Sequence, residues 1–143
     1  MENRSLAQQN WKQGKCRIED GIFFGDDRVI LFDDKEQSIK TLDQLVETKP
    51  GFWTELDIAA EYQSREYGVQ VFAGGGSWEG EGFVAVSQLE DEQLLWLIHL
   101  SDSEAFISVK IQDDNIYAVS QEYPSHWEWI IPIYHPQKLK KIS

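Results

Sequence analysis

Apolar and polar side chains alternate with a period of two along most of the chain, which is typical of half-buried β-strands. The longest alternating stretch begins at Phe52, and its apolar side contains Phe52, Thr54, Leu56, Ile58, Ala60 and Tyr62. Acidic residues occupy most of the other side, so we expect one long strand with one wet face. The same reasoning predicts strands near 18–24, 67–72, 83–89, 94–100, 104–111, 116–121 and 127–133. A continuous apolar run between turn signals at 29–32 predicts a strand that is buried on both faces.

Helical spacing occurs in one short segment, around residues 39–48, where Ile39, Leu42, Leu45 and Val46 recur three and four residues apart. Thr41 and Gln44 have the spacing of a capping box, with Ser38 as a competing N-cap, and Pro50-Gly51 ends the helix. Short connections between the later strands imply antiparallel neighbours. We therefore predict an α+β domain, mainly antiparallel β-sheet with one short helix. A curved sheet, a half-barrel and a two-sheet sandwich remain open.

The 143 residues have the length of one domain, and we find no internal repeat or linker. We expect a single domain, residues 1–143, with loosely ordered ends at 1–14 and 138–143. Cys16 is the single cysteine, so an intramolecular disulfide is impossible. The first residues are polar and lack the apolar core of a secretory signal, and no apolar run has the length of a membrane span. These features predict a cytoplasmic protein that does not insert into membranes.

Net charge is the strongest compositional signal. The whole chain has a charge of −12, and residues 16–137 hold 7 Lys and Arg against 24 Asp and Glu, a net charge of −17. A uniform negative field repels phosphate, so we expect no binding to nucleic acid. It attracts cationic partners, although solubility alone is a sufficient reason for it.

Familiar catalytic patterns are missing from the sequence. The Gly-rich segment 73–82 lacks the Lys-Ser/Thr ending of a phosphate loop, and Glu79 replaces the second glycine of a nucleophile elbow after Ser77. His99 lies inside an apolar run, where a hydrogen-bonded core residue is more common than a catalyst. His126 and His135 have no carboxylate at the H-E-x-x-H offset. We therefore expect no enzyme activity, no cofactor and no metal.

The most promising surface features are aromatic residues beside acids, because a buried aromatic anchor surrounded by charge gives affinity and steers association. The Gly-rich segment supplies Trp78, Glu79 and Glu81 on an expected recognition loop. Acid pairs at predicted turns add further candidates. The predicted partner-binding residues are Trp78, Glu79, Glu81, Asp102, Glu104, Asp113, Asp114 and Tyr123.

The chain resembles the small acidic immunity proteins of bacterial contact-dependent inhibition and polymorphic-toxin systems. The resemblance lies in VFAGGGSWEGEGFVAV (71–86), LLWLIHLSDSEAF (94–106), NIYAVS (115–120) and WEWIIPI (127–133). It is one of style, since these families share no defining motif, and it assigns no individual residue. It implies binding to a cognate toxin domain, often a basic nuclease. The alternative function is a small-molecule or carbohydrate-binding β-sheet module.

Overall fold

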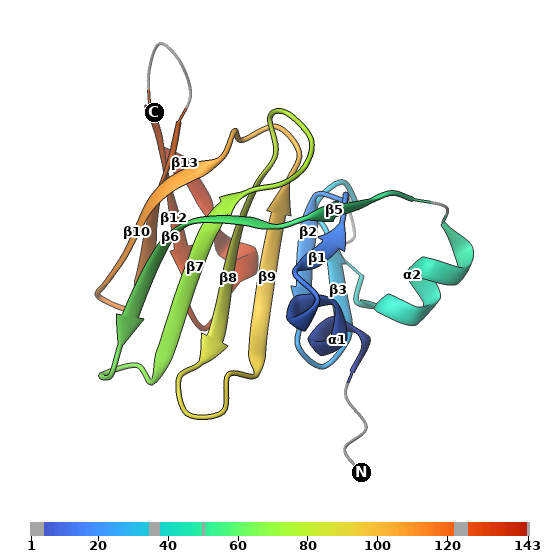
Figure 1. Cartoon of the computed structure of the whole chain (residues 1–143), viewed down its shortest axis with the longest axis horizontal. Helices are drawn as coiled ribbons and strands as arrows, with labels where there is room; N and C mark the ends of the chain where they lie inside the picture. The colour runs from blue at the N-terminus through green and yellow to red at the C-terminus, as the bar shows by residue number, and fades with distance from the viewer. Residues whose placement is uncertain (1–4, 35–37, 50, 122–125, 143) are drawn as a thin grey trace.

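A computed structural model describes residues 5–34, 38–49, 51–121 and 126–142. It has the predicted α+β architecture dominated by antiparallel sheet (Figure 1). The helices are α1 (Leu6–Lys12), α2 (Leu42–Thr48) and the 3₁₀ turn η1 (Pro136–Lys138). The strands are β1 (Lys15–Arg17), β2 (Gly21–Phe24), β3 (Arg28–Leu31), β4 (Lys40–Thr41), β5 (Trp53–Glu55), β6 (Asp57–Ser64), β7 (Val69–Gly75), β8 (Gly82–Gln88), β9 (Leu94–Leu100), β10 (Phe106–Gln112), β11 (Asn115–Gln121), β12 (His126–Pro132) and β13 (Lys140–Ile142).

Within the described residues, the strands form three open antiparallel sheets. Seven strands follow the order β4-β3-β2-β9-β8-β7-β6, four follow β10-β11-β12-β13, and β1 pairs with β5. The four-stranded sheet lies behind β6–β8 in Figure 1, and side chains from both sheets share one core. Of the architectures left open above, the two-sheet sandwich describes this part of the molecule.

The central strands of the seven-stranded sheet, β2, β9 and β8, are buried on both faces because the strand period of two separates two apolar sets. Ile22, Ile98 and Val84 are cross-strand neighbours on the face that meets the four-stranded sheet. Phe23 and Leu97 lie on the opposite face, which α1, α2 and the β1–β5 pair cover. This explains the continuous apolar run of β9, and residues 29–31 are likewise buried, as predicted for a strand covered on both faces.

Helix α2 begins later than expected. Lys40 and Thr41 form the short strand β4, and Thr41 is the N-cap whose hydroxyl accepts a hydrogen bond from Gln44 N at 3.3 Å. Leu42 and Leu45 are buried as the periodicity predicts, whereas Val46 is exposed and Ile39 lies exposed before the helix begins. The helix therefore follows the predicted capping-box position rather than Ser38.

Parts of both ends of the chain form regular secondary structure. Residues 6–12 form α1, because Leu6 N and Ala7 N both donate to the Asp27 carboxylate, at 3.0 and 2.7 Å. Near the other end, Lys140–Ile142 pair with β12 as strand β13. Both segments are held by partners distant in sequence, which local composition does not reveal.

The prediction of a single long strand from Phe52 is wrong, because the structure has two strands there, β5 and β6. Leu56 N donates to Gly14 O at 2.8 Å, which separates β5 from β6. A register shift between Ile58 and Ala60 then changes which side chains share a face. Because β6 is the last strand of its sheet, most of its side chains are exposed. The alternation predicted strand correctly but not its interruption.

Candidate functional site

Two loops meet at the upper end of the sandwich in Figure 1, between β7 and β8 and between β9 and β10. Glu104 N donates to Gly80 O at 2.8 Å, which ties the two loops together. Strand β5 lies beside them, since Glu55 N donates to Ser77 Oγ at 3.1 Å. We call this region, residues 52–55, 76–81 and 101–105, the loop end.

A buried ion pair lies directly beneath the loop end. Glu81 Oε1 and His99 Nε2 are 2.6 Å apart, and the side chains are only 2% and 1% exposed. The other carboxylate oxygen of Glu81 accepts hydrogen bonds from Thr54 Oγ1 and Trp78 N, both at 2.7 Å. His99 Nδ1 lies 3.0 Å from the Glu19 carbonyl oxygen. The prediction that His99 is a hydrogen-bonded core residue is confirmed.

The hydrogen-bond geometry favours the charged form of this pair. Both ring nitrogens of His99 face acceptors, and only an imidazolium has two N–H donors to offer them. Burial opposes ionisation of Glu81, but the hydrogen bonds from His99, Thr54 and the Trp78 amide outweigh it and hold its pKa below the usual value. Every polar atom of the pair therefore has a partner, as a buried charge requires.

The buried carboxylate of Glu81 also fixes the recognition loop. Ser77 N donates to Thr54 Oγ1 at 2.7 Å, so Thr54 links the loop to Glu81 through a single hydroxyl. At Gly76, an added Cβ would lie 2.4 Å from both the Glu81 carboxylate and Thr54 Oγ1. Glycine is needed there because the backbone passes so close to these side chains. The glycine at position 76 thus reflects close packing against a buried acid.

Above this network, two aromatic rings are unusually exposed. Phe52 is 73% exposed and Trp78 57%, and their ring centroids lie 6.4 Å apart with the planes inclined at 59°. Trp53 follows Phe52 in the chain, and Lys15 Nζ and Arg17 Cζ lie 5.0 and 6.0 Å from its ring centroid. Four exposed acids belong to the same region, namely Glu55, Glu79, Asp102 and Glu104. Exposed apolar rings within an acidic surface are a feature of protein-binding sites.

The structure divides the predicted partner-binding residues into two groups. Trp78, Glu79, Asp102 and Glu104 come together at the loop end. Glu81 belongs to this end but is 3% exposed, so it positions the loop and offers no carboxylate to a partner.

Asp113 and Asp114 lie in the β10–β11 turn at the opposite end of β10. There, Tyr67 donates its hydroxyl proton to Asp114 Oδ1 at 2.7 Å. Tyr123 lies outside the described residues. Sequence reasoning missed Phe52, whose place on an alternating apolar face suggested burial, and it missed the positioning roles of Thr54 and His99.

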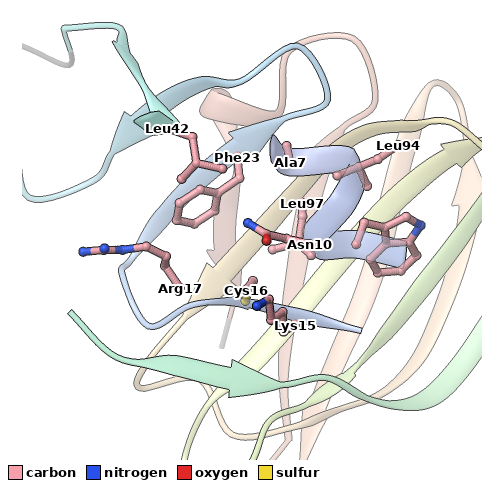
Figure 2. Close-up of a pocket in the computed structure, with 10 residues that line it drawn as sticks. Ala7, Asn10, Lys15, Cys16, Arg17, Phe23, Leu42, Leu94 and Leu97 are labelled. Atoms are coloured by element: carbon pink, nitrogen blue, oxygen red, sulfur yellow. The ribbon is translucent and has the colours of Figure 1, made fainter. Parts of the chain in front are cut away.

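A small cavity lies between α1 and β1, with Asn10 facing Cys16 across it (Figure 2). Its volume of about 20 Å³ has room for one water molecule. Burial, and secondarily the negative charge of Glu81, raises the pKa of the Cys16 thiol, which disfavours the reactive thiolate. This cavity therefore suits neither a substrate nor a nucleophile.

The Arg17 side chain, 3% exposed, closes one side of the same cavity. Its Nη2 donates to Glu19 Oε1 at 2.9 Å and to Lys49 O at 3.0 Å. Burial works against ionisation of Glu19, but hydrogen bonds from Arg17 and Lys49 prevail and lower the pKa of this carboxyl. Because the Glu19 carbonyl oxygen also faces His99, the Arg17–Glu19–Lys49 contacts and the Glu81–His99 pair are neighbours in space.

An open groove of about 480 Å³ occupies the other end of the sandwich. Its lining includes the aromatic side chains of Phe24, Tyr67, Trp96 and Tyr134 and the polar side chains of Arg28, Gln88 and Glu90.

Within the described ranges, no three His, Cys, Asp or Glu side chains are grouped so as to hold a metal ion. In that same part of the chain, no helix has both the length and the apolar character to cross a membrane.

Comparisons with protein-family models, curated proteins and solved structures gave no match to this chain.

Proposed function

We propose that this protein is a binding module that associates with a basic protein through its loop end. One observation carries the proposal: exposed aromatic rings lie among exposed carboxylates, on loops held by a buried ion pair. Phe52 and Trp78 provide apolar area, and Glu55, Glu79, Asp102 and Glu104 provide charge. Rigid anchors lose little conformational freedom on binding, which favours affinity.

Charge supports a basic partner. Residues 16–137 have a net charge of −17, which produces a long-range negative field. Such a field raises the association rate with a cationic surface, to as much as ~10⁸–10⁹ M⁻¹s⁻¹ at low salt. It also opposes compaction of the chain itself, so a binding role would compensate for that cost.

The kind of partner follows from the resemblance to immunity proteins. We propose that the protein neutralises a cognate toxin domain of the bacterial contact-dependent or polymorphic-toxin kind. Nucleases need cationic surfaces to bind phosphate, and an acidic inhibitor can occupy such a surface. In this proposal the loop end contacts the toxin and the protein acts without catalysis of its own.

The test is co-expression with the product of the neighbouring gene. We expect that product to be lethal alone and tolerated when this protein is present. The purified pair should associate at least roughly tenfold more slowly when salt is raised from about 0.02 M to about 0.5 M. A harmless neighbour, or a complex whose association rate ignores salt, would contradict the proposal.

Charge reversal distinguishes the two ends of the molecule. Glu79→Lys with Glu104→Lys should slow association, whereas Asp113→Lys at the opposite end, made as a control, should have a much smaller effect. A larger effect of Asp113→Lys would place the interface at the β10–β11 turn instead.

The open groove favours a second candidate, a small-molecule or carbohydrate-binding module. Its aromatic lining offers stacking surfaces, and Gln88 and Glu90 offer hydrogen bonds. A thermal-shift screen of sugars tests this candidate, because a ligand at a hundred times its Kd stabilises a protein by about 2.7 kcal/mol. A stabilising sugar whose effect disappears in Tyr134→Leu, which removes an exposed ring of the groove, would support it.

A further inference from the structure

Phe52 and Trp78 form an open wedge at the loop end. Their planes are inclined at 59°, their centroids are 6.4 Å apart, and both rings are more than half exposed. Among the described residues, no Lys or Arg of this chain lies over either ring. Within the described ranges, the wedge therefore has two aromatic faces over which no cation of this chain lies.

The ring of Trp53, the residue after Phe52, already contacts two cations of this chain. Trp53 has Lys15 Nζ at 5.0 Å and Arg17 Cζ at 6.0 Å from its centroid, so its face is already occupied. An aromatic face attracts a cation through its quadrupole. Trp78, with a similar ring and a higher exposure, has the same capacity but no internal cation.

Negative charge lies close to the wedge. Glu79 follows Trp78 directly and is exposed. The Glu104 carboxylate lies next to Gly80, since a Cβ added to that glycine would be 3.9 Å from Glu104 Oε1. A cation between the rings would therefore also be attracted by carboxylates at the rim.

We propose that the wedge between Phe52 and Trp78 receives an arginine side chain of the basic partner. This inference rests on the proposed function and adds the chemistry of the anchor. A guanidinium is planar and weakly hydrated, so it stacks on an aromatic face while its N–H groups remain free for Glu79 and Glu104. A lysine ammonium is a strongly hydrated point charge and gains less from the same surface.

The test uses ¹⁵N-labelled full-length protein titrated with hexa-arginine at low salt, with hexa-lysine as the comparison probe. We expect the Trp78 indole N–H resonance to shift saturably, and hexa-arginine to bind more tightly than hexa-lysine. Trp78→Ala and Phe52→Ala should each weaken hexa-arginine binding by roughly three- to thirtyfold. Tyr134→Ala removes an equally exposed ring (66%) near the other end and should change affinity less than about twofold.

Two further variants separate cation recognition from apolar contact. Trp78→Phe keeps an aromatic face and should retain most of the affinity, whereas Trp78→Leu keeps apolar area without a quadrupole and should behave like Trp78→Ala. Equal affinity of Trp78→Phe and Trp78→Leu would overturn the inference. So would equal affinity of the two peptides.

The inference and the proposed function fail differently. If the ring variants bind hexa-arginine as tightly as wild type while Glu79→Lys with Glu104→Lys weakens it, the wedge is not the anchor, but the acidic surface still binds cations. If this double charge reversal is also without effect, the loop end is not the site that binds cations. The proposed function then has no binding surface at the loop end. Unchanged thermal midpoints show that each variant is folded, which is expected because the substituted side chains are exposed.

Discussion

The Glu81–His99 pair places two charges where an apolar pair would pack without desolvation cost. A buried ion pair is weak evidence for stability, since burying both charges opposes their mutual attraction. The pair instead holds the Glu81 carboxylate in one orientation. Its oxygen atoms then determine where the Thr54 hydroxyl and the Trp78 amide must lie to donate their hydrogen bonds. We interpret the pair as the element that gives the loop one conformation, and this interpretation is testable at a single residue.

Replacing His99 with leucine should be strongly destabilising. His99→Leu removes the partner of Glu81 but leaves the carboxylate buried, which costs about 3–5 kcal/mol in the free energy of unfolding. Urea denaturation measures this change. The matched double variant, His99→Leu with Glu81→Leu, should recover part of the loss because no buried charge remains. A single variant within about 1 kcal/mol of wild type would show that Glu81 is satisfied without His99.

Part of this site could be read from the sequence. An imidazole within the apolar run 94–100 has to be buried, so His99 was predictable as a hydrogen-bonded core residue. Its partner was not predictable, because Glu81 lies 18 residues away and the alternation places it in a glycine-rich loop. The register of β8 and β9 brings the two together, and the short connection between these strands predicts that they pair but not their register.

At the scale of elements, α1 shows how a short helix is ordered by hydrogen bonds to residues that are distant in the sequence. Gln8 acts like a strand partner: its amide nitrogen donates to Leu94 O, and Leu94 N donates to its oxygen, both at 2.8 Å. The helix has only seven residues, and one of that length is unstable alone. Its order therefore depends on Gln8 and on the cap from Asp27.

Truncating Gln8 should weaken the attachment of α1 to Leu94 in β9. Gln8→Ala leaves Leu94 N and O without their partner, and we expect a loss of about 1–3 kcal/mol. Amide hydrogen exchange should also become faster at Leu94. Lys12→Ala, an exposed position on the same helix, serves as the control and should stay within about 0.5 kcal/mol. Unchanged exchange at Leu94 would mean that water replaces the Gln8 carboxamide without cost.

Strand elements were more predictable than their arrangement. The period of two located most of β7 to β12, because alternate side chains of a strand lie on the same face of the sheet and pack into the same core. It failed at β6, where an edge position and the register shift after Ile58 remove the burial that alternation implies. Sheet order, such as β9 pairing with β2, depends on contacts that short connections do not specify.

At the scale of the whole molecule, acidity has two opposing effects on stability. Exposed carboxylates repel one another at neutral pH, so their protonation reduces this repulsion and favours the folded state. The Glu19 and Glu81 carboxyls behave oppositely, since burial resists their ionisation but their hydrogen-bond partners lower the pKa below the usual 4.5. In the unfolded chain these two groups take up protons at a higher pH than in the folded protein. Their contribution is therefore present above about pH 4.5 and is lost as pH falls through the folded pKa.

Salt separates these two effects, because it screens exposed charges far more than buried pairs. In about 0.5 M NaCl, where screening extends only ~4 Å, the free energy of unfolding should fall as pH decreases below about 4.5. Glu19→Gln should lower stability at neutral pH, but its curve should approach the wild-type curve in acid, since protonated Glu19 has lost the same charge. Glu66→Gln, an exposed residue in the β6–β7 turn, should leave the acid limb unchanged. Urea denaturation across this pH range measures each curve, and parallel curves for wild type and Glu19→Gln would show that the Arg17–Glu19–Lys49 contacts do not stabilise the fold through charge.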